Sequence, residues 1–356
     1  MLQQSGAEQT PAPSSGPRRI AAMLRVVLLG IAAALVLWLF SKVLLLLFFA
    51  VLLACTLRGA ADDLARLTHL SSRLILALMT LVIIALAAAA FWWIGPALAD
   101  QGSDLVTSLT GEIDRLSKHY GSTRWGSAIE QHFGGFSPSA MQVGAPAFTV
   151  LGYALSGVGD IVLLSITALY LAVTPEVYER GVVSLVAIRH RPRVLAILRQ
   201  IGRTLRLWLL GQMVDMVAVG VLAAIGLWLL GVPVPLALGV LAGLLTFIPY
   251  FGAIAAGVPG VLVALTVSPM VALYAVGVFL LCHLMEGYIL SPLLQRRLVE
   301  LPPAVSLLSM AAAGSLLGPL GIVMGTPLAA AMMVAVREGY VVDVLGDTEA
   351  HHDDEG

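Results

Sequence analysis

Two acidic residues stand in the middle of long apolar runs, where a charge is costly. Asp160 lies about ten residues into the run 150–174, and Asp215 lies about eight residues into the run 207–230. A charge at mid-bilayer costs about 2.5–3.5 kcal/mol on insertion scales, so a function is the first hypothesis for each. At a rise of 1.5 Å per residue, both would reach mid-depth on consecutive antiparallel helices. The two carboxylates could then share a proton or hold a cation. The alternative is a purely structural role, in which each forms a hydrogen bond that stiffens the helix packing, for example between Asp215 and Gln212.

A second acidic group stands with a histidine near the end of the apolar run 271–290. His283 and Glu286 are three residues apart, which places them on one face of a helix. They could act as a proton relay or a gate. The alternatives are an interfacial pair that touches water, and for His283 a packing role.

Other catalytic patterns are missing or misplaced. No Walker loop, HExxH motif or Cys/His cluster occurs, so we expect no metal site, no cofactor and no nucleotide-driven step. The stretch 157–160 reads Gly-Val-Gly-Asp, as in intramembrane aspartyl proteases, but the second acid, Asp215, lacks the preceding tyrosine of that family. We therefore expect that the protein is not an enzyme.

The composition places the bulk of the chain in a lipid bilayer. Of 356 residues, 59% are hydrophobic and 12% are charged, and the mean hydropathy is +0.95. The net charge of -1 offers no basic field for nucleic acid. Both cysteines lie inside apolar runs, which excludes a disulfide framework. The sequence predicts an all-α polytopic membrane protein.

The order of apolar and charged stretches divides the chain into six parts. These are a disordered tail at 1–17, transmembrane helices at 18–95, an extracytoplasmic amphipathic segment at 96–149, two more transmembrane helices at 150–230 around a basic loop at 175–206, a broken-helix core at 231–337, and an acidic tail at 338–356. The amphipathic segment would lie on the membrane or against a partner. Lysine and arginine gather in alternate loops, which predicts that both termini are cytoplasmic.

Two apolar stretches in the core are interrupted by proline and glycine. The first interruption separates 236–248 from 252–267, and the second separates 304–317 from 322–336. The residues at the breaks are Pro249, Tyr250, Gly252, Gly318, Pro319 and Gly321, and the half-helix starts reach Gly257 and Gly325. Re-entrant hairpins would give about six full crossings plus two hairpins, and kinked crossings would give eight. Paired broken segments point to a transport site, although glycine and proline also merely kink membrane helices.

Several stretches in this region carry a family resemblance. They are Leu229 to Pro233, Gly243 to Gly252, Glu286 to Pro292, Leu301 to Pro303, and Gly314 to Pro327. Across 207–337 the chain resembles the autoinducer-2 exporter family of bacterial permeases. Members of that family usually carry asparagine where Thr246 stands, so the chain departs from the family there. Thr246 and Gln212 complete the candidate ion and substrate pathway, with Asp160, Asp215, His283 and Glu286. The resemblance implies a multi-pass inner-membrane transporter that exports a furanone-derived signal or exchanges sodium for protons.

We therefore expect a permease that moves a small polar solute by an ion-coupled mechanism in the bacterial inner membrane. The alternatives are a monovalent cation/proton antiporter and a membrane scaffold that transports nothing. Gly220, Ala223, Ala224 and Gly226 would let helices pack closely, which makes a homo-oligomer plausible.

Overall fold

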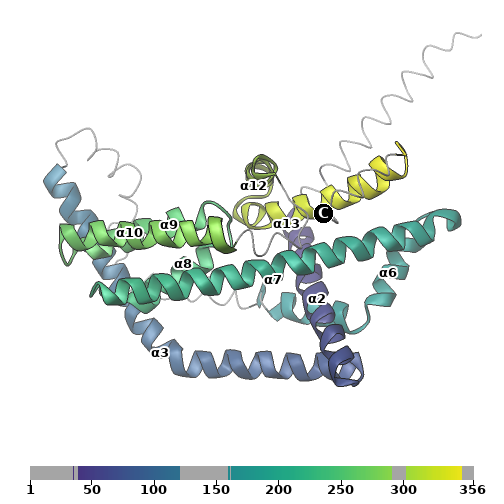
Figure 1. Cartoon of the computed structure of the whole chain (residues 1–356), viewed down its shortest axis with the longest axis horizontal. Helices are drawn as coiled ribbons and strands as arrows, with labels where there is room; N and C mark the ends of the chain where they lie inside the picture. The colour runs from purple at the N-terminus through teal and green to yellow at the C-terminus, as the bar shows by residue number, and fades with distance from the viewer. Residues whose placement is uncertain (1–34, 36–38, 121–158, 161, 291–301, 347–356) are drawn as a thin grey trace, which may run out of the picture.

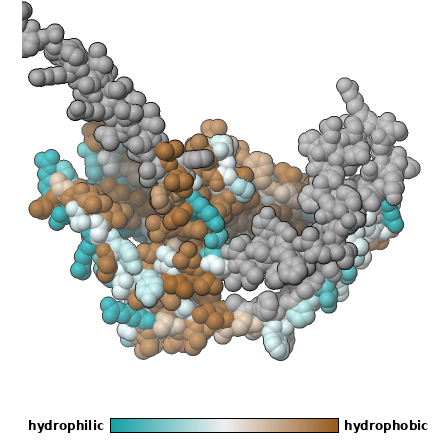
Figure 2. Space-filling view, turned by 180° about the vertical axis from the view of Figure 1, so that it is seen from behind, coloured by the Kyte–Doolittle hydropathy of each residue, from teal (hydrophilic) through white to brown (hydrophobic). Residues whose placement is uncertain are grey.

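The computed structural model describes residues 35, 39–120, 159–160, 162–290 and 302–346, and every regular element in them is a helix (Figure 1). Hydrophobic side chains cover much of the face shown in Figure 2, as expected for surface that faces lipid. The protein is an all-α polytopic membrane protein, as predicted. The N-terminal tail at 1–17 and the parts of the predicted segments at 18–34, 121–149 and 347–356 lie outside the described residues.

Among the described residues, four helices are long and apolar enough to cross a membrane. They are α2 (Ser41–Thr68), the helix Ile188–Leu229 that contains α7 (Arg191–Leu229), Pro269–Tyr288 that contains α10 (Pro269–Met285), and Pro319–Val342 that contains α13 (Pro319–Val336). The helix Val162–Val173 forms a fifth candidate together with α6 (Pro175–Ser184), from which it is bent by 83°. The first predicted crossing, in the apolar run 20–40, lies largely outside the described residues.

Helix α3 (Ser72–Tyr120) joins two segments that the sequence separates. It runs through Pro96 without a break, so the boundary expected at residues 95 and 96 falls inside one helix. Pro96 cannot donate a hydrogen bond to the carbonyl of Trp92, and a proline in that position bends a helix. Figure 1 shows α3 bent along its length. Leu105 and Leu109, in its second half, pack against the core of the chain's own broken helices rather than against a separate partner.

The first broken segment forms α8 (Pro235–Leu245) and α9 (Gly252–Leu265), which contact each other. Tyr250 lies between them in the left-handed region, with φ of 67°. A Cβ on Gly252 would collide with the carbonyl oxygen of Leu245, so only glycine fits at the start of α9. The break therefore falls at the predicted residues.

The second broken segment is an antiparallel hairpin with unequal arms. The arms are α12 (Pro303–Leu317) and α13, and Gly318 turns the chain between them with φ of 72°. Gly321 faces Ala313 and Gly325 faces Met310 across the hairpin, so each glycine permits a close backbone contact. The short arm agrees with the predicted half-segment, whereas α13 and its continuation are long enough to cross a membrane.

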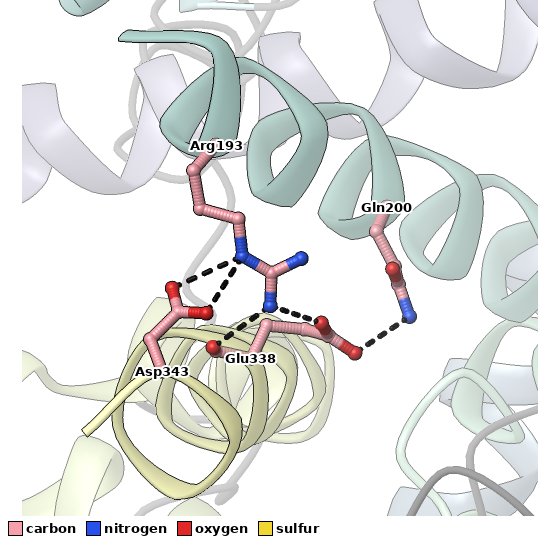
Figure 3. Close-up of polar contacts among 4 residues, drawn as sticks. All are labelled: Arg193, Gln200, Glu338 and Asp343. Atoms are coloured by element: carbon pink, nitrogen blue, oxygen red, sulfur yellow. Dashed lines mark hydrogen bonds and ion pairs between the residues drawn. The ribbon is translucent and has the colours of Figure 1, made fainter. Parts of the chain in front are cut away.

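Residues 337–343 continue the structure of α13 and pack against α7. Helix α13 continues as the π-helix η4 (Arg337–Val342), in which Glu338 is 2% exposed. Figure 3 shows the Arg193 guanidinium, on α7, between two carboxylates: Nη2 is 2.9 Å from Oε2 of Glu338, and Nε is 2.9 Å from Oδ1 of Asp343. Gln200 donates to Oε1 of Glu338 at 3.3 Å. The predicted acidic tail therefore does not begin at residue 338.

The small residues of α7 pack within the chain. A Cβ on Gly243 of α8 would lie 2.6 Å from the carbonyl oxygen of Met216, and one on Gly239 would lie 2.5 Å from the Ala224 Cβ. Gly220 also faces α8, Gly226 faces Val278 of α10, and Ala223 is fully buried. The small residues from which we expected a homo-oligomer therefore contact helices of the same chain. They no longer support that expectation.

The start of α8 is capped by a side chain from α3. Val234 precedes α8 with φ of 54°, and its own side chain makes no capping hydrogen bond. Oε1 of Gln101 instead accepts hydrogen bonds from the amides of Leu236 at 3.1 Å and Ala237 at 3.2 Å. The amides at the start of a helix need such acceptors, so Gln101 ties the second half of α3 to the first hairpin.

Removal of this acceptor is expected to loosen the contact between α3 and the first hairpin. Gln101→Met keeps the size of the side chain, and loss of a cap costs about 1 kcal/mol. Gln101→Glu keeps an acceptor at a helix N-terminus, where negative charge is favourable, so it should match the wild type. The midpoint of thermal unfolding in detergent measures both variants. Equal midpoints for Gln101→Met and the wild type would show that the cap does not stabilise the protein.

Candidate functional site

Gln212 supports the break between α8 and α9. Its Nε2 donates to the carbonyl oxygen of Thr246 at 2.7 Å, and both residues are buried. In a continuous helix that carbonyl would accept from the amide of residue 250, but the chain leaves the helix at Leu245. The Thr246 hydroxyl donates back to the carbonyl of Ala242 at 2.8 Å. The Gln212 amide thus binds the backbone of the break.

Asp215 lies about one turn further along α7, within the range at which its charge interacts with that of a second acid. Its carboxylate interacts electrostatically with Glu286, which also interacts with Tyr250 in the break. Oδ1 of Asp215 and Oε2 of Glu286 are buried and have no hydrogen-bond partner in the part of the chain that the structure describes. His283 is near, with Nδ1 3.7 Å from Oε2 of Glu286. Glu286 thus interacts with Asp215, with the ring nitrogen of His283 and with Tyr250 of the α8–α9 break, and we call this group the carboxylate site.

A change of helix type occurs at Glu286. Helix α10 ends at Met285, and the π-helix η3 (Glu286–Leu290) follows directly. Short π-helical insertions often mark functional sites. The sequence contains no signal for this change, although Glu286 itself was a predicted site residue.

Asp160 lies in a different environment from Asp215. Its Oδ2 is 2.9 Å from Nζ of Lys42 on α2, and the two side chains are 42% and 63% exposed. The structure thus pairs Asp160 with a cation and brings Asp215 to Glu286. Depth along two helices suggested an Asp160–Asp215 pair, but depth says nothing about the direction in which each side chain points.

The predicted glycines and prolines of the hairpins support packing and turns. Gly257 lies 3.6 Å from the ring of Phe279 on α10, measured from an ideal Cβ. Pro249 precedes the left-handed Tyr250, and Pro319 opens α13 in its first turn, where proline is tolerated. These residues shape the elements around the carboxylate site, and the described structure gives them no polar contact with it.

The second hairpin reaches the first break through an aromatic cluster. Phe247, in the break, packs edge-on against Trp208 of α7 with ring centroids 5.7 Å apart, and against Phe49 of α2 at 6.4 Å. Ala331 of α13 packs against the same buried group. The first break and α13 thus pack against one shared apolar cluster.

Removal of the Gln212 donor is expected to destabilise the break. Gln212→Leu keeps the volume but leaves the buried carbonyl of Thr246 without a donor, which costs about 1–3 kcal/mol. The thermal unfolding midpoint in detergent should fall by several degrees. Met213→Leu, at the exposed neighbouring position, is the matched control and should leave the midpoint unchanged. A Gln212→Leu protein as stable as this control would contradict the assigned role.

The helices and the comparisons with known proteins together define a multi-pass membrane transporter. The profile of the AI-2E family transporters matches residues 27–340, so the chain belongs to this family. The chain is 26% identical to YueF of Bacillus subtilis over 299 residues, which cover 79% of this chain and 81% of YueF. It is 36% identical to YrrI of the same organism over 144 residues, which cover 40% of this chain and 41% of YrrI. It is also 36% identical to YhhT of Escherichia coli over 110 residues, 31% of this chain and 32% of YhhT. All three relatives are named as candidate transport proteins.

Proposed function

We propose that the chain is a secondary transporter that moves a small polar solute past the carboxylate site, coupled to a proton or sodium gradient. The observation that carries the proposal is the pair Asp215 and Glu286, each with a buried oxygen that has no hydrogen-bond partner in the described residues. Two neighbouring carboxylates repel each other, and a proton or a small cation between them removes that repulsion. Residues of this kind inside a membrane mark ion and substrate paths.

The break between α8 and α9 supports the same proposal. Non-helical backbone at membrane depth is tolerated where protein or a water-filled cavity satisfies it, and transport sites in secondary transporters commonly lie at such breaks. Gln212 satisfies one backbone carbonyl of the break from α7. The protein would act in the bacterial inner membrane, with both termini in the cytoplasm as the loop charges favour.

A monovalent cation/proton antiporter is the second candidate, favoured by the closeness of the two carboxylates. An antiporter needs a group that binds a proton and a cation in turn, and a carboxylate pair can do both. In this case sodium and protons would be the only species moved. The third candidate is a scaffold that transports nothing. A scaffold does not explain why two acidic side chains are buried at this site.

The test uses the full chain in liposomes that contain a pH-sensitive dye. In the first measurement a sodium gradient is imposed and the dye reports proton movement. In the second, the liposomes are loaded with a furanone signal molecule and its release is measured by mass spectrometry. Furanone release that depends on a proton or sodium gradient supports the solute transporter. Sodium-driven proton movement without furanone release supports the antiporter. Absence of both fluxes contradicts the antiporter and the export of a furanone, and it favours the scaffold.

A further inference from the structure

Helix α6 lies across the direction of the apolar helix that precedes it. The axis bends by 83° between Val162–Val173 and Pro175–Ser184, at a break of one residue, Thr174. Val162–Val173 is an apolar helix, and it belongs to the run 150–174 that the sequence predicts to cross the membrane. If that helix runs along the membrane normal, a helix almost perpendicular to it lies in the plane of the membrane.

The two sides of α6 have different partners. On one side Glu179 forms an ion pair with Arg199 of α7, with 3.3 Å between Oε2 and Nη2. Away from this ion pair Val177 is 64% exposed and Leu185 86%, and Val182, which lies three residues after Glu179 at the edge of this apolar surface, is 48% exposed. Tyr178 is also exposed. Helix α6 is therefore tied to α7 along its polar face and presents an uncovered apolar face.

Basic groups stand beside this apolar face. Arg180 on α6 and Arg189 just after it make no ion pair or hydrogen bond with any part of the chain that the structure describes. Arg191 is used differently, because it donates to the carbonyls of Val186 at 3.2 Å and Ser184 at 3.4 Å and so closes the end of α6. Two guanidinium groups without a partner among the described residues thus flank the apolar surface of α6.

We propose that α6 lies in the headgroup layer of the bilayer, with Val177, Val182 and Leu185 among the acyl chains and with Arg180 and Arg189 bound to the phosphates of anionic phospholipids. An in-plane amphipathic helix buries its apolar face at this boundary and gains from anionic lipid. Guanidinium groups match phosphate oxygens in pairs, and a tyrosine such as Tyr178 suits the interface. This lipid site lies apart from the carboxylate site and does not depend on the transported solute.

The first test measures the depth of α6 in the intact protein. Val182→Cys and Glu176→Cys, the latter on the polar side of α6, are labelled with a fluorophore in liposomes. The wild type serves as the blank, because Cys282 is buried and Cys55 is half-buried. We expect brominated phospholipids to quench the label at Val182 much more than the label at Glu176. Quenching of the Val182 label by aqueous iodide instead, or protection from both quenchers, would overturn the proposal, since the second result indicates cover by protein.

The second test measures lipid selectivity. Spin-labelled phosphatidylglycerol and phosphatidylcholine compete for the protein surface, and the variants are Arg180→Gln with Arg189→Gln, and Arg180→Lys with Arg189→Lys. Each basic residue near the surface should favour anionic lipid about fivefold, so the glutamine pair should lose most of the selectivity. The lysine pair should keep most of it because the charge remains. Unchanged selectivity in the glutamine pair would overturn the assignment of the two arginines.

Discussion

Replacement of Asp215 by asparagine is expected to abolish most of the ion-coupled flux through the protein. Asparagine keeps the size of the side chain but can neither bind a proton at neutral pH nor neutralise a cation. An interaction with a charged group contributes about 1.5–3 kcal/mol, so the flux at limiting ion concentration should fall about 10- to 100-fold. Proton and sodium movement in liposomes, compared with the wild type at equal protein content, measures the loss. Glu286→Gln should reduce the flux similarly if the two carboxylates act together.

Asp160→Asn is the matched control for these two substitutions. It makes the same chemical change in an apolar run, but Asp160 is half-exposed and paired with Lys42. Exposed ion pairs contribute little, so we expect less than about a twofold change in flux. The unfolding midpoint of Asp215→Asn should equal or exceed that of the wild type, because a buried unpaired charge is removed. Full flux in Asp215→Asn, or equal losses in all three variants, would contradict the carboxylate site.

Much of the site could be predicted from residue type and position along the chain. The break residues Pro249 and Gly252 stand out because proline and glycine interrupt an apolar run, and the structure ends one helix and begins another there. Asp215 and Glu286 stand out because acids are rare in such runs. Their closeness could not be predicted, because it depends on how α7 and α10 are rotated about their axes. If the acid stood two residues earlier or later on α7, its side chain would point to a different side of the helix.

The extent of helices was harder to predict than their presence. Composition changes at Gly95 and Pro96, yet α3, which is 49 residues long, continues to Tyr120 because Leu105 and Leu109 pack on the apolar surface of the first hairpin. The same applies to residue 338, where the sequence turns acidic but the helix continues. In both cases tertiary contacts outweigh the local composition, and the sequence alone does not reveal the partner surface.

The contact between Arg193 and Glu338 gives the second prediction with a large expected effect. Glu338 is almost fully buried, whereas the Arg193 side chain is 40% exposed and also pairs with Asp343 (Figure 3). Arg193→Met leaves a buried carboxylate whose one remaining partner among the described residues is the Gln200 amide. Breaking a buried ion pair in this way costs about 3–5 kcal/mol, and the remaining hydrogen bond and the solvent near Arg193 place the expected cost near the lower limit.

The opposite substitution should cost less, because the two partners are buried to different degrees. Glu338→Met removes the buried charge and leaves an arginine that keeps Asp343 and reaches water, so we expect about 1 kcal/mol. The double variant Arg193→Met with Glu338→Met should be more stable than Arg193→Met alone, since apolar side chains of similar volume can replace a buried pair. Unfolding midpoints in detergent give the order: wild type and double variant highest, Glu338→Met next, Arg193→Met lowest. If Glu338→Met were the least stable of the four proteins, the buried carboxylate would have to stabilise the end of α13 through more than its bond to Arg193.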